Sequence, residues 1–491
     1  MIELIKKISL FFCLFYISFF VFCQKKIHTV TILYDHPPRT LDPHLRNEIV
    51  TISILSNIYE ALVDYTPDLR ITPCLAKNWY QSDSLTWIFD LRENVFFHNG
   101  KEMKAQDVVY SLYRPIREKE SERSGLVRVI DTIYAINSYR IVIKTKFPYY
   151  SLLNELDLLY IVPSGYNNFS NPVGTGPYRN FLISEDSIIC DLYQNYWGKK
   201  PMIVKGVFKF IPELEERIKL LKSSESCIIY GVPVDLYYKL KDSIKMEIIA
   251  NVATRYLQFN LKKHPFDNKD FRRALSMAIN RQEIDNELYY GLAEPANQFV
   301  PKGLIGYCPD LPPLEYNPDS AGLLIKKFNK IKINLYYGKP LQRLGNKIAC
   351  YLCAAGIEVN ENPLEIGEFW SGVEKRKFDL YLISSLATNL DGLAGILLTF
   401  LYTYNPDKKT GLMNRSGFSN PTIDSLIDFA FKIEDPEQRL SLIKDIQMLL
   451  LKDMPIVPIV WEPRIYGISK NIKFKPRIDQ TIRLKEIKFS R

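Results

Sequence analysis

The histidines and carboxylates of this chain show none of the arrangements that catalytic or metal-binding motifs require. The 491 residues include five histidines, and no two of them are three or four positions apart, as the ligands on a metal-binding helix would be. Neither a Gly-x-Ser-x-Gly nucleophile motif nor a His-Glu-x-x-His zinc motif occurs. Carboxylates are numerous but evenly spread. We therefore expect no enzymatic activity, no metal and no cofactor.

Two cysteines, Cys350 and Cys353, have the spacing of a redox or zinc motif. They lie in a stretch with helical periodicity, residues 341–355, and neither a second cysteine pair nor a histidine is near them in sequence. Because a zinc site needs four ligands, or three and a water, this pair is insufficient. We expect both to be buried cysteines of a helix.

A glycine-rich segment, residues 171–178 (NPVGTGPY), also invites a chemical interpretation. It is not a phosphate-binding loop, because no Lys-Ser or Lys-Thr follows and Pro177 lacks the amide that such a loop would supply. Two glycines and two prolines in eight residues predict a sharp reversal of the chain instead.

Length and composition indicate a globular protein of two or three domains. Hydrophobic residues make up 47% and charged residues 24%, which is ordinary for a soluble chain. The net charge of +9 is modest, and lysines and arginines are scattered, so we expect no nucleic-acid partner. The 31 tyrosines and 27 phenylalanines could line a cleft, although most must belong to the core.

The first residues predict export. Lys6 and Lys7 precede an apolar run, residues 8–22, that is short for a membrane-spanning helix, and polar residues follow. We expect residues 1–23 to be a signal peptide and the mature protein to lie in the periplasm or on the outer face of the cell membrane. Cys23 stands where a bacterial lipoprotein is acylated, but Phe22 replaces the usual small residue before it. Lipidation and a retained signal anchor both stay open.

The elements that follow alternate between strand-like and helix-like patterns, which predicts an α/β fold. Expected strands are 27–34, 85–92, 130–135, 140–145, 182–193, 204–211, 226–230, 254–261, 332–336, 357–360, 378–384 and 454–459. Expected helices are 49–62, a helix from 105, 214–221, 271–279, 341–355, a helix beginning within 417–426, and 435–451.

Several short motifs are similar to one family of proteins. Residues 251–281 combine Phe259–Asn260, a Pro265–Phe266 turn, an Arg-Arg-Ala-Leu helix and Asn280–Arg281. LDPH at 41–44, the series from Trp87 to Ser111, VGTGPY at 173–178 and GFSNP at 417–421 add to the pattern. The chain resembles the extracellular solute-binding proteins of the peptide and nickel ABC importers (family 5) over nearly its whole mature length.

This resemblance implies a large, class II periplasmic binding protein fold, in which two lobes close on a ligand and the first lobe carries an extra subdomain. The implied division is a signal peptide at 1–23, lobe 1 at 24–67, its small subdomain at 68–168, lobe 1 again at 169–255, lobe 2 at 256–459 and a last part of lobe 1 at 460–491. A closing motion about two crossings, 251–259 and 458–462, would capture the solute.

Ligand-contacting positions also follow from the resemblance. The wall after LDPH would be formed by Asn47, Glu48 and Ile49, and the loop of lobe 2 by Leu386, Thr388, Asn389 and Asp391. In oligopeptide binders a carboxylate of that loop holds the peptide ammonium, whereas here Thr388 occupies its position. Asp391 could substitute for it.

Two further departures affect the solute. Leu382 replaces a basic residue that receives the peptide carboxylate in some relatives, and residues 384–398 lack the histidine that nickel binding would need. Arg255 could bind an anionic group through two hydrogen bonds, or could form an ordinary surface ion pair.

The function expected from the resemblance is capture of an oligopeptide and its delivery to an ABC permease with its ATPase subunits. We expect a monomer that touches the membrane only through an N-terminal anchor. A non-peptide solute of the same family, or a surface interaction protein that kept the fold, are the alternatives.

Overall fold

The computed structural model describes residues 28–490, except residues 47, 119, 123–128 and 387–389. The expected signal peptide and Cys23 therefore lie outside the described residues. Within the described part, no helix has both the length and the apolar character needed to cross a membrane.

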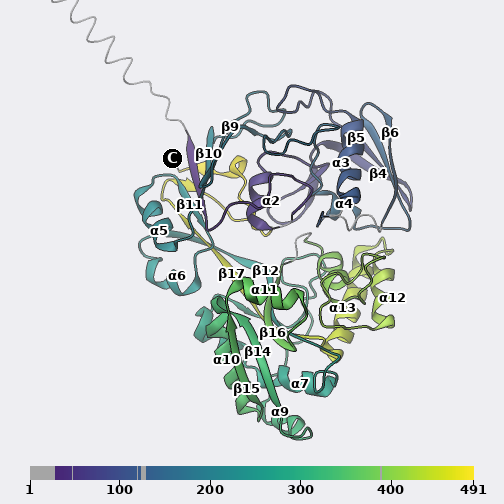
Figure 1. The fold of residues 1–491 in the computed structure, drawn as a ribbon. Coiled ribbons are helices and arrows are strands. Elements are labelled where there is room, and N and C mark those ends of the chain that lie inside the picture. The colour runs from purple at the N-terminus through teal and green to yellow at the C-terminus, as the bar shows by residue number, and fades with distance from the viewer. Residues whose placement is uncertain (1–27, 47, 119, 123–128, 387–389, 491) are drawn as a thin grey trace, which may run out of the picture.

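One large mixed sheet runs through the whole molecule (Figure 1). A short strand, β13 (Glu294–Pro295), pairs with β17 beside the main path. The path runs in the order β15 (Glu358–Leu364), β14 (Lys332–Gly338), β16 (Leu380–Leu386), β12 (Lys245–Phe259), β17 (Ile456–Ile468), β11 (Cys227–Tyr230), β1 (Thr29–Tyr34), β10 (Lys205–Phe210), β9 (Ser187–Leu192) and β8 (Tyr178–Ile183).

The strands divide the molecule into two lobes, one above the other in Figure 1. We call the part with β1 and β8 to β11 the first lobe, and the part with β14 to β16 the second lobe. Strands β12 and β17 are long and antiparallel, and they belong to both lobes, since β11 pairs with one end of β17 and β16 with the other end of β12. The lobes are thus joined by continuous sheet.

A smaller antiparallel sheet enlarges the first lobe. Its order is β4 (Ala76–Asp83), β5 (Thr86–Leu91), β7 (Arg140–Thr145) and β6 (Ile130–Asn137), and α3 (Ala105–Arg117) packs against it. Alternate residues of β5, namely Trp87, Phe89 and Leu91, are buried, as the period of two predicts. These side chains join one hydrophobic core with residues of the second lobe.

Helices cover both faces of the sheet. In the first lobe they are α2 (Ile49–Leu55), α4 (Leu152–Leu156), α5 (Leu214–Ser223) and α6 (Val234–Leu240). The second lobe holds α7 (Lys269–Ala278), α8 (Arg281–Ile284), α9 (Pro318–Ile325), α10 (Gln342–Ala354), α11 (Ile366–Glu374), α12 (Pro421–Ala430), α13 (Pro436–Asp453) and the π-helical segments η2 (Asp285–Tyr289) and η4 (Gly392–Leu401).

The helix expected at 49–62 is wrong in its second half, because α2 ends at Leu55. The reason lies in the glycine-rich segment. The carbonyl of Ile58 accepts from the Gly176 amide (2.9 Å) and that of Asn57 from the Tyr178 amide (3.2 Å). A Cβ at Gly176 would lie 2.6 Å from the Ile58 oxygen, so only glycine permits this approach.

Other expectations were wrong in detail. The single strand expected at 182–193 is two strands, β8 and β9, joined by a turn, and β12 begins nine residues before the expected Thr254. Cys350 and Cys353 are free and exposed rather than buried. Leu344, Ile348 and Leu352 form the buried face of α10, and a spacing that fits them places both cysteines on the outer face.

The end of the chain packs on the first lobe after β17. The Ile482 amide donates to Ser53 Oγ (2.7 Å) and the Leu484 amide to Asn57 Oδ1 (2.8 Å), so the segment lies along α2. Arg477, whose side chain is fully buried, donates to the Tyr65 carbonyl (2.8 Å) between β2 (Val63–Tyr65) and the C-terminal segment. A strand pair, β18 (Ile472–Lys473) and β19 (Lys488–Phe489), closes the segment.

Candidate functional site

The two crossing strands bring the lobes together, and their ladder is irregular where they cross. The pairing of β12 with β17 shifts register between Ala250 and Thr254 and again between Arg255 and Tyr256. Such bulges interrupt the ladder and increase the local twist. The interruption falls at the junction between lobes, which is where a hinge must bend.

Arg255 lies at this junction and is paired within the protein. Its Nη2 is 2.7 Å from Glu462 Oε2, and the two side chains are only 22% and 17% exposed. The Tyr289 hydroxyl donates to the other carboxylate oxygen of Glu462 at 2.6 Å. Burial raises the pKa of Glu462, but Arg255 and Tyr289 more than offset it and hold that pKa below its usual range. Arg255 Nε is buried without a partner among the described residues.

An aromatic contact supports the same crossing. Trp461, which precedes Glu462 on β17, donates from Nε1 to Thr254 Oγ1 on β12 (3.1 Å). The ring of Tyr307, from the second lobe, meets the Trp461 ring edge to face at 5.9 Å. The indole is buried, so this hydrogen bond satisfies a donor that would otherwise cost free energy.

The lobes also touch directly, away from the crossing strands. Asn154 on α4 donates from Nδ2 to Asp391 Oδ2 of the second lobe at 2.9 Å, and it accepts from the Tyr65 hydroxyl at 3.0 Å. Nearby, Tyr149 stacks on Phe431 with centroids 5.0 Å apart. The structure is therefore one in which the lobes are in contact.

Asp391 also caps a helical segment at this contact between the lobes. Its Oδ1 accepts from the amides of Leu393 (2.9 Å) and Ala394 (3.4 Å) and so caps η4. With the side chain 2% exposed and both oxygens engaged, Asp391 is not open to a peptide ammonium in this structure. The suggestion that it replaces the missing carboxylate stays a prediction.

The predicted wall of the first lobe is partly described. Glu48 caps α2: its carboxylate accepts from the amides of Val50 and Thr51, both at 3.0 Å. Ile49 is the first residue of that helix. The preceding LDPH is fixed by Arg114 of α3, which donates from both terminal nitrogens to Asp42 at 2.6 Å. Asn47 lies outside the described residues.

Of the remaining predicted positions, Leu386 is the last residue of β16. Backbone pairing places Leu386 opposite Ala253, at the lobe junction, and Ser384 opposite Arg255. Thr388 and Asn389 lie outside the described residues. The contact roles of these positions, and of Asn47, Glu48 and Ile49, stay predictions.

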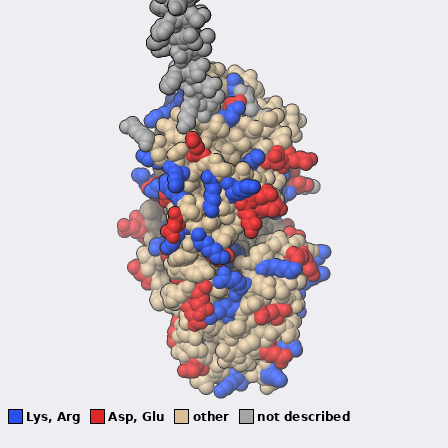
Figure 2. Space-filling model, turned by 90° about the vertical axis from the view of Figure 1, so that its left-hand side faces the viewer, with Lys and Arg blue, Asp and Glu red and all other residues tan. Residues whose placement is uncertain are grey.

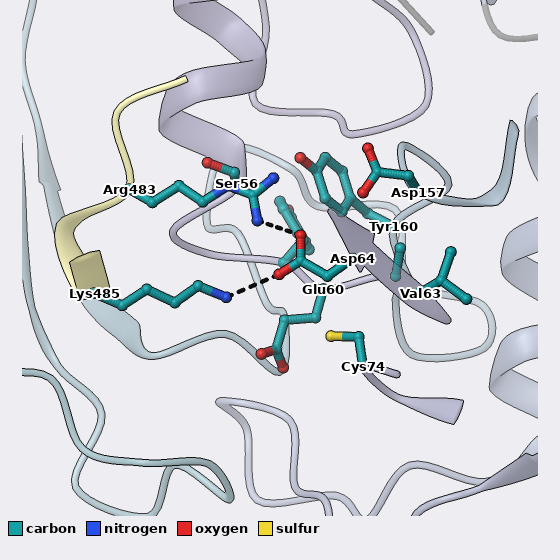
Figure 3. Close-up of a pocket in the computed structure, with 11 residues that line it drawn as sticks. Ser56, Glu60, Val63, Asp64, Cys74, Asp157, Tyr160, Arg483 and Lys485 are labelled. Atoms are coloured by element: carbon teal, nitrogen blue, oxygen red, sulfur yellow. Dashed lines mark hydrogen bonds and ion pairs between the residues drawn. The ribbon is translucent and has the colours of Figure 1, made fainter. Parts of the chain in front are cut away.

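A buried group of charges lies beside α2, where the end of the chain meets the first lobe (Figure 3). Asp64 Oδ2 accepts from Lys485 Nζ at 3.1 Å, and Asp64 Oδ1 pairs with Arg483. The Glu60 carboxylate accepts from Tyr196 (2.7 Å), Trp197 (2.7 Å) and Thr175 (3.0 Å). Burial, followed by the nearby charge of Asp64, raises the pKa of Asp157 to about 7. Ion pairing thus joins segments that are far apart in sequence.

Several of these residues carried no sequence signal. Tyr289 has no local motif, and Asn154 sits in an ordinary short helix. Glu462 ends the predicted crossing 458–462, but the sequence does not indicate its partner. Glu60 lies in the predicted helix 49–62, where nothing in the sequence indicates its role. Within the described residues, no cluster of three or more His, Cys, Asp or Glu is placed to hold a metal ion. On the face shown in Figure 2, basic and acidic side chains are interspersed.

Two lobes joined by crossing strands and in direct contact define the class of two-lobed periplasmic binding proteins. Comparison with known proteins gives the family. A model of the bacterial extracellular solute-binding proteins, family 5, matches residues 70–408. This chain belongs to that family, which is a family of substrate-binding proteins of ABC importers and not of enzymes.

Curated relatives are similar over most of their length. The glutathione-binding protein GsiB of Salmonella typhimurium is 25% identical over 456 residues, which is 88% of this chain and 89% of that protein. The protein of the same name from Pectobacterium atrosepticum is 24% identical over 458 residues, 88% of each chain.

Solved structures share the fold. The ABC transporter-associated periplasmic binding protein DppA from Helicobacter pylori, in complex with the peptide STSA, has a TM-score of 0.82 at 23% identity and covers 94% of this chain and 98% of its own. NikA from Brucella suis, in complex with Fe(III)-EDTA, has a TM-score of 0.82 at 21% identity, with 94% and 100% covered.

Proposed function

We propose that this protein captures a short peptide or peptide-like solute between its lobes, outside the cytoplasmic membrane, for an ABC permease and its ATPase subunits. The observation that carries the proposal is that β12 and β17 are shared by both lobes while α4 and η4 touch across them. Binding and release need only a change of angle at the crossing, and no covalent step is involved.

The peptide class is supported by the relatives. The curated proteins GsiB are named for glutathione, a tripeptide, and the structure of DppA contains the peptide STSA. The pairing of the two shared strands shifts register at the junction, and exposed strand backbone is a surface on which an extended peptide can dock.

A non-peptide solute is the second candidate, and one observation favours it. Among the predicted site residues that the structure describes, each carboxylate is already engaged: Glu48 caps α2, and Asp391 caps η4 and binds Asn154. Glu462 is paired with Arg255. A peptide ammonium buried without a carboxylate would be costly, so a solute without an ammonium would fit these residues better.

The division into domains given above, the signal peptide at 1–23, the acylation of Cys23, the periplasmic or cell-surface location and the monomeric state belong to the same proposal. Mass spectrometry of the mature protein released from membranes tests the anchor. A diacylglycerol on Cys23 would establish the lipoprotein, and a free N-terminus beyond residue 23 would contradict it.

Native mass spectrometry of protein purified without denaturation tests the solute. A co-purified mixture of short peptides, together with a rise in the unfolding temperature on adding glutathione or tripeptides, is the expected result. A single co-purified non-peptide compound would establish the second candidate. Protein that purifies without a bound compound, and whose unfolding temperature no peptide raises, would overturn the transport proposal. It would favour a surface protein that kept the fold.

A further inference from the structure

Apart from the pocket shown in Figure 3, a hollow lies in the second lobe, away from the junction between the lobes. It has a volume of about 190 Å³ and is open to solvent. Asn260, which contributes to it, follows the end of β12 that pairs with the beginning of β16, whereas the first lobe meets the other end of β12. A solute in this hollow would therefore not lie between the lobes.

The floor of the hollow is aromatic and rigid. Phe378 stacks on Tyr336 with centroids 4.2 Å apart and planes 17° apart, and Tyr381 meets Phe378 at 6.1 Å. Helix α11 packs so closely on this floor that a Cβ at Gly372 would lie 2.1 Å from the Phe378 ring. Phe369 also stacks on Phe378 (5.9 Å, 20°), and Phe378 and Tyr381 are only 8% and 4% exposed, so the floor offers a small preformed apolar surface.

Arg415 lines the same hollow, and its neighbours fix its backbone. On one side Asn414, which is fully buried, donates to the carbonyls of Tyr402 (2.7 Å) and Phe418 (2.8 Å). On the other side the buried Ser416 donates to Asn414 Oδ1 (2.9 Å) and accepts at its carbonyl from the Leu261 amide (2.9 Å). The backbone that carries Arg415 is thus fixed, yet Arg415 Nη1 is buried and has no partner among the described residues.

Two more cations line the hollow. Arg376 ends α11 in the left-handed conformation (φ 51°), where its amide donates to the Val373 carbonyl at 3.1 Å, and its guanidinium lies over the Tyr404 ring. Lys262 is exposed beside Gly417. Among the described residues none of these cations is paired with a carboxylate. The neighbouring Asp379 is engaged by Lys263 (3.0 Å) and Asn260 (3.3 Å).

A structural explanation accounts for part of this arrangement. A cation after α11 stabilises the carbonyl end of that helix, and Arg376 also gains from the Tyr404 ring. That explanation does not account for Arg415, whose Nη1 is buried and has no partner among the described residues. Such a nitrogen lowers stability unless a ligand satisfies it.

We propose that this hollow is a second ligand site, which takes a small organic oxyanion. Arg415 and Arg376 would bind the carboxylate or phosphate group through charge-assisted hydrogen bonds, with Lys262 adding positive charge at the rim. The apolar part of the ligand contacts the small area that Phe378 and Tyr381 leave exposed. This site is independent of the solute between the lobes and does not rest on the function proposed above.

Isothermal titration calorimetry of the mature protein with phenyl phosphate tests the site. We expect binding that weakens about tenfold or more in each of Arg415→Gln and Arg376→Gln, since each loses charge-assisted hydrogen bonds. Lys262→Gln, at an exposed position that folding does not need, should weaken binding severalfold. The matched control Arg273→Gln removes an exposed charge of α7 and should leave affinity unchanged, because salt screens distant charges.

Two controls address the chemistry. Phenol, which lacks the oxyanion, should not bind detectably, and inorganic phosphate should bind more weakly than phenyl phosphate because it lacks the aromatic part. The proposal is overturned if phenyl phosphate gives no heat up to about 10 mM, a range that covers even weak binding. Unchanged affinity in all three glutamine variants would equally overturn it, because the ligand would then sit elsewhere.

Discussion

Asn154 and Asp391 are 237 positions apart in sequence, yet the amide of Asn154 donates to the carboxylate of Asp391 at 2.9 Å across the two lobes. The same amide group accepts from Tyr65, so one side chain joins the body of the first lobe, its short helix α4 and the cap of η4. The contact between lobes is therefore specific.

Asn154→Ala should loosen the contact between the lobes. It leaves a buried carboxylate oxygen and a buried tyrosine hydroxyl without their partner, which costs about 1–3 kcal/mol in the free energy of unfolding. Small-angle X-ray scattering of the solute-free variant should show a larger radius of gyration than the wild type. Asn360→Ala, at an exposed residue of β15 whose side chain donates to Asn334 Oδ1, is the matched control. Equal radii for wild type and Asn154→Ala would show that this contact does not hold the lobes together.

The ion pair at the crossing should behave as a unit. Arg255→Gln and Glu462→Gln should each lower the free energy of unfolding by about 2–3 kcal/mol, somewhat less than for a fully buried pair, because each leaves a charge without its partner. The double variant should lose less than the sum of the two. Urea unfolding measures all three variants.

A control for the pair is Lys332→Gln, which breaks an exposed pair with Glu358 and should leave the free energy of unfolding almost unchanged, because solvent screens exposed ion pairs. Additive losses in the double variant would mean that Arg255 and Glu462 stabilise the protein separately. Arg255→Ala also tests the ligand hypothesis made from the sequence: it should weaken binding sharply if the solute is anionic, and unchanged affinity would leave Arg255 with its structural role alone.

Asp157 should make the protein less stable as the pH rises. Its folded pKa is raised to about 7, above an unfolded value of about 4, so folding favours the protonated acid. Stability should fall from about pH 4 to about pH 7 and then level off. In Asp157→Asn this loss disappears, so the variant should match the wild type near pH 4 and exceed it by about 2–4 kcal/mol at pH 8.

Urea unfolding at several pH values checks this difference, and Asp131→Asn, at an exposed residue of β6, serves as the control. If wild type and Asp157→Asn differ by the same amount at pH 4 and pH 8, proton binding at Asp157 does not contribute.

Gly174 should not accept a larger side chain. A Cβ there would lie 2.1 Å from the Ile58 oxygen, so Gly174→Ala must move backbone and should lower the free energy of unfolding by about 1–3 kcal/mol. Gly367→Ala provides the opposite case, because no atom lies within 4 Å of its Cβ position and the residue belongs to helix α11. It should stabilise the protein by about 0.5–1 kcal/mol. Urea unfolding measures the stability of both variants. Equal changes of the same sign in their free energies of unfolding would show that the space around each glycine does not decide the outcome.

The fold was largely predictable because its signals are local. Most expected strands and helices exist within a few residues, and the motif at 251–281 does form a strand, a turn and a helix. The end of α2 was missed because apolar spacing continues to Leu62, while the carbonyls that would extend the helix accept hydrogen bonds from residues 176 and 178.

The site was less predictable because its contacts connect distant parts of the chain. Arg255 and Glu462 each stood on a predicted crossing, but they are 207 residues apart and nothing in the sequence indicates that they pair. Asn154 gave no signal at all, since an asparagine in a short helix is common. Asp391 was singled out as a possible ligand group, whereas its neighbours engage both of its oxygens.

The C-terminal segment has a consequence for the order of folding. Arg483 and Lys485 complete the ion pairs of Asp64, and Arg477 donates to the Tyr65 carbonyl, so the first lobe lacks part of its interior until this segment is present. The second lobe, apart from the shared strand β17, is one continuous stretch of chain. As a newly made chain emerges, the second lobe can therefore collapse first, while the first lobe waits for the end of synthesis. Truncation after β17 should then unfold the amino-terminal half of the protein and spare the middle.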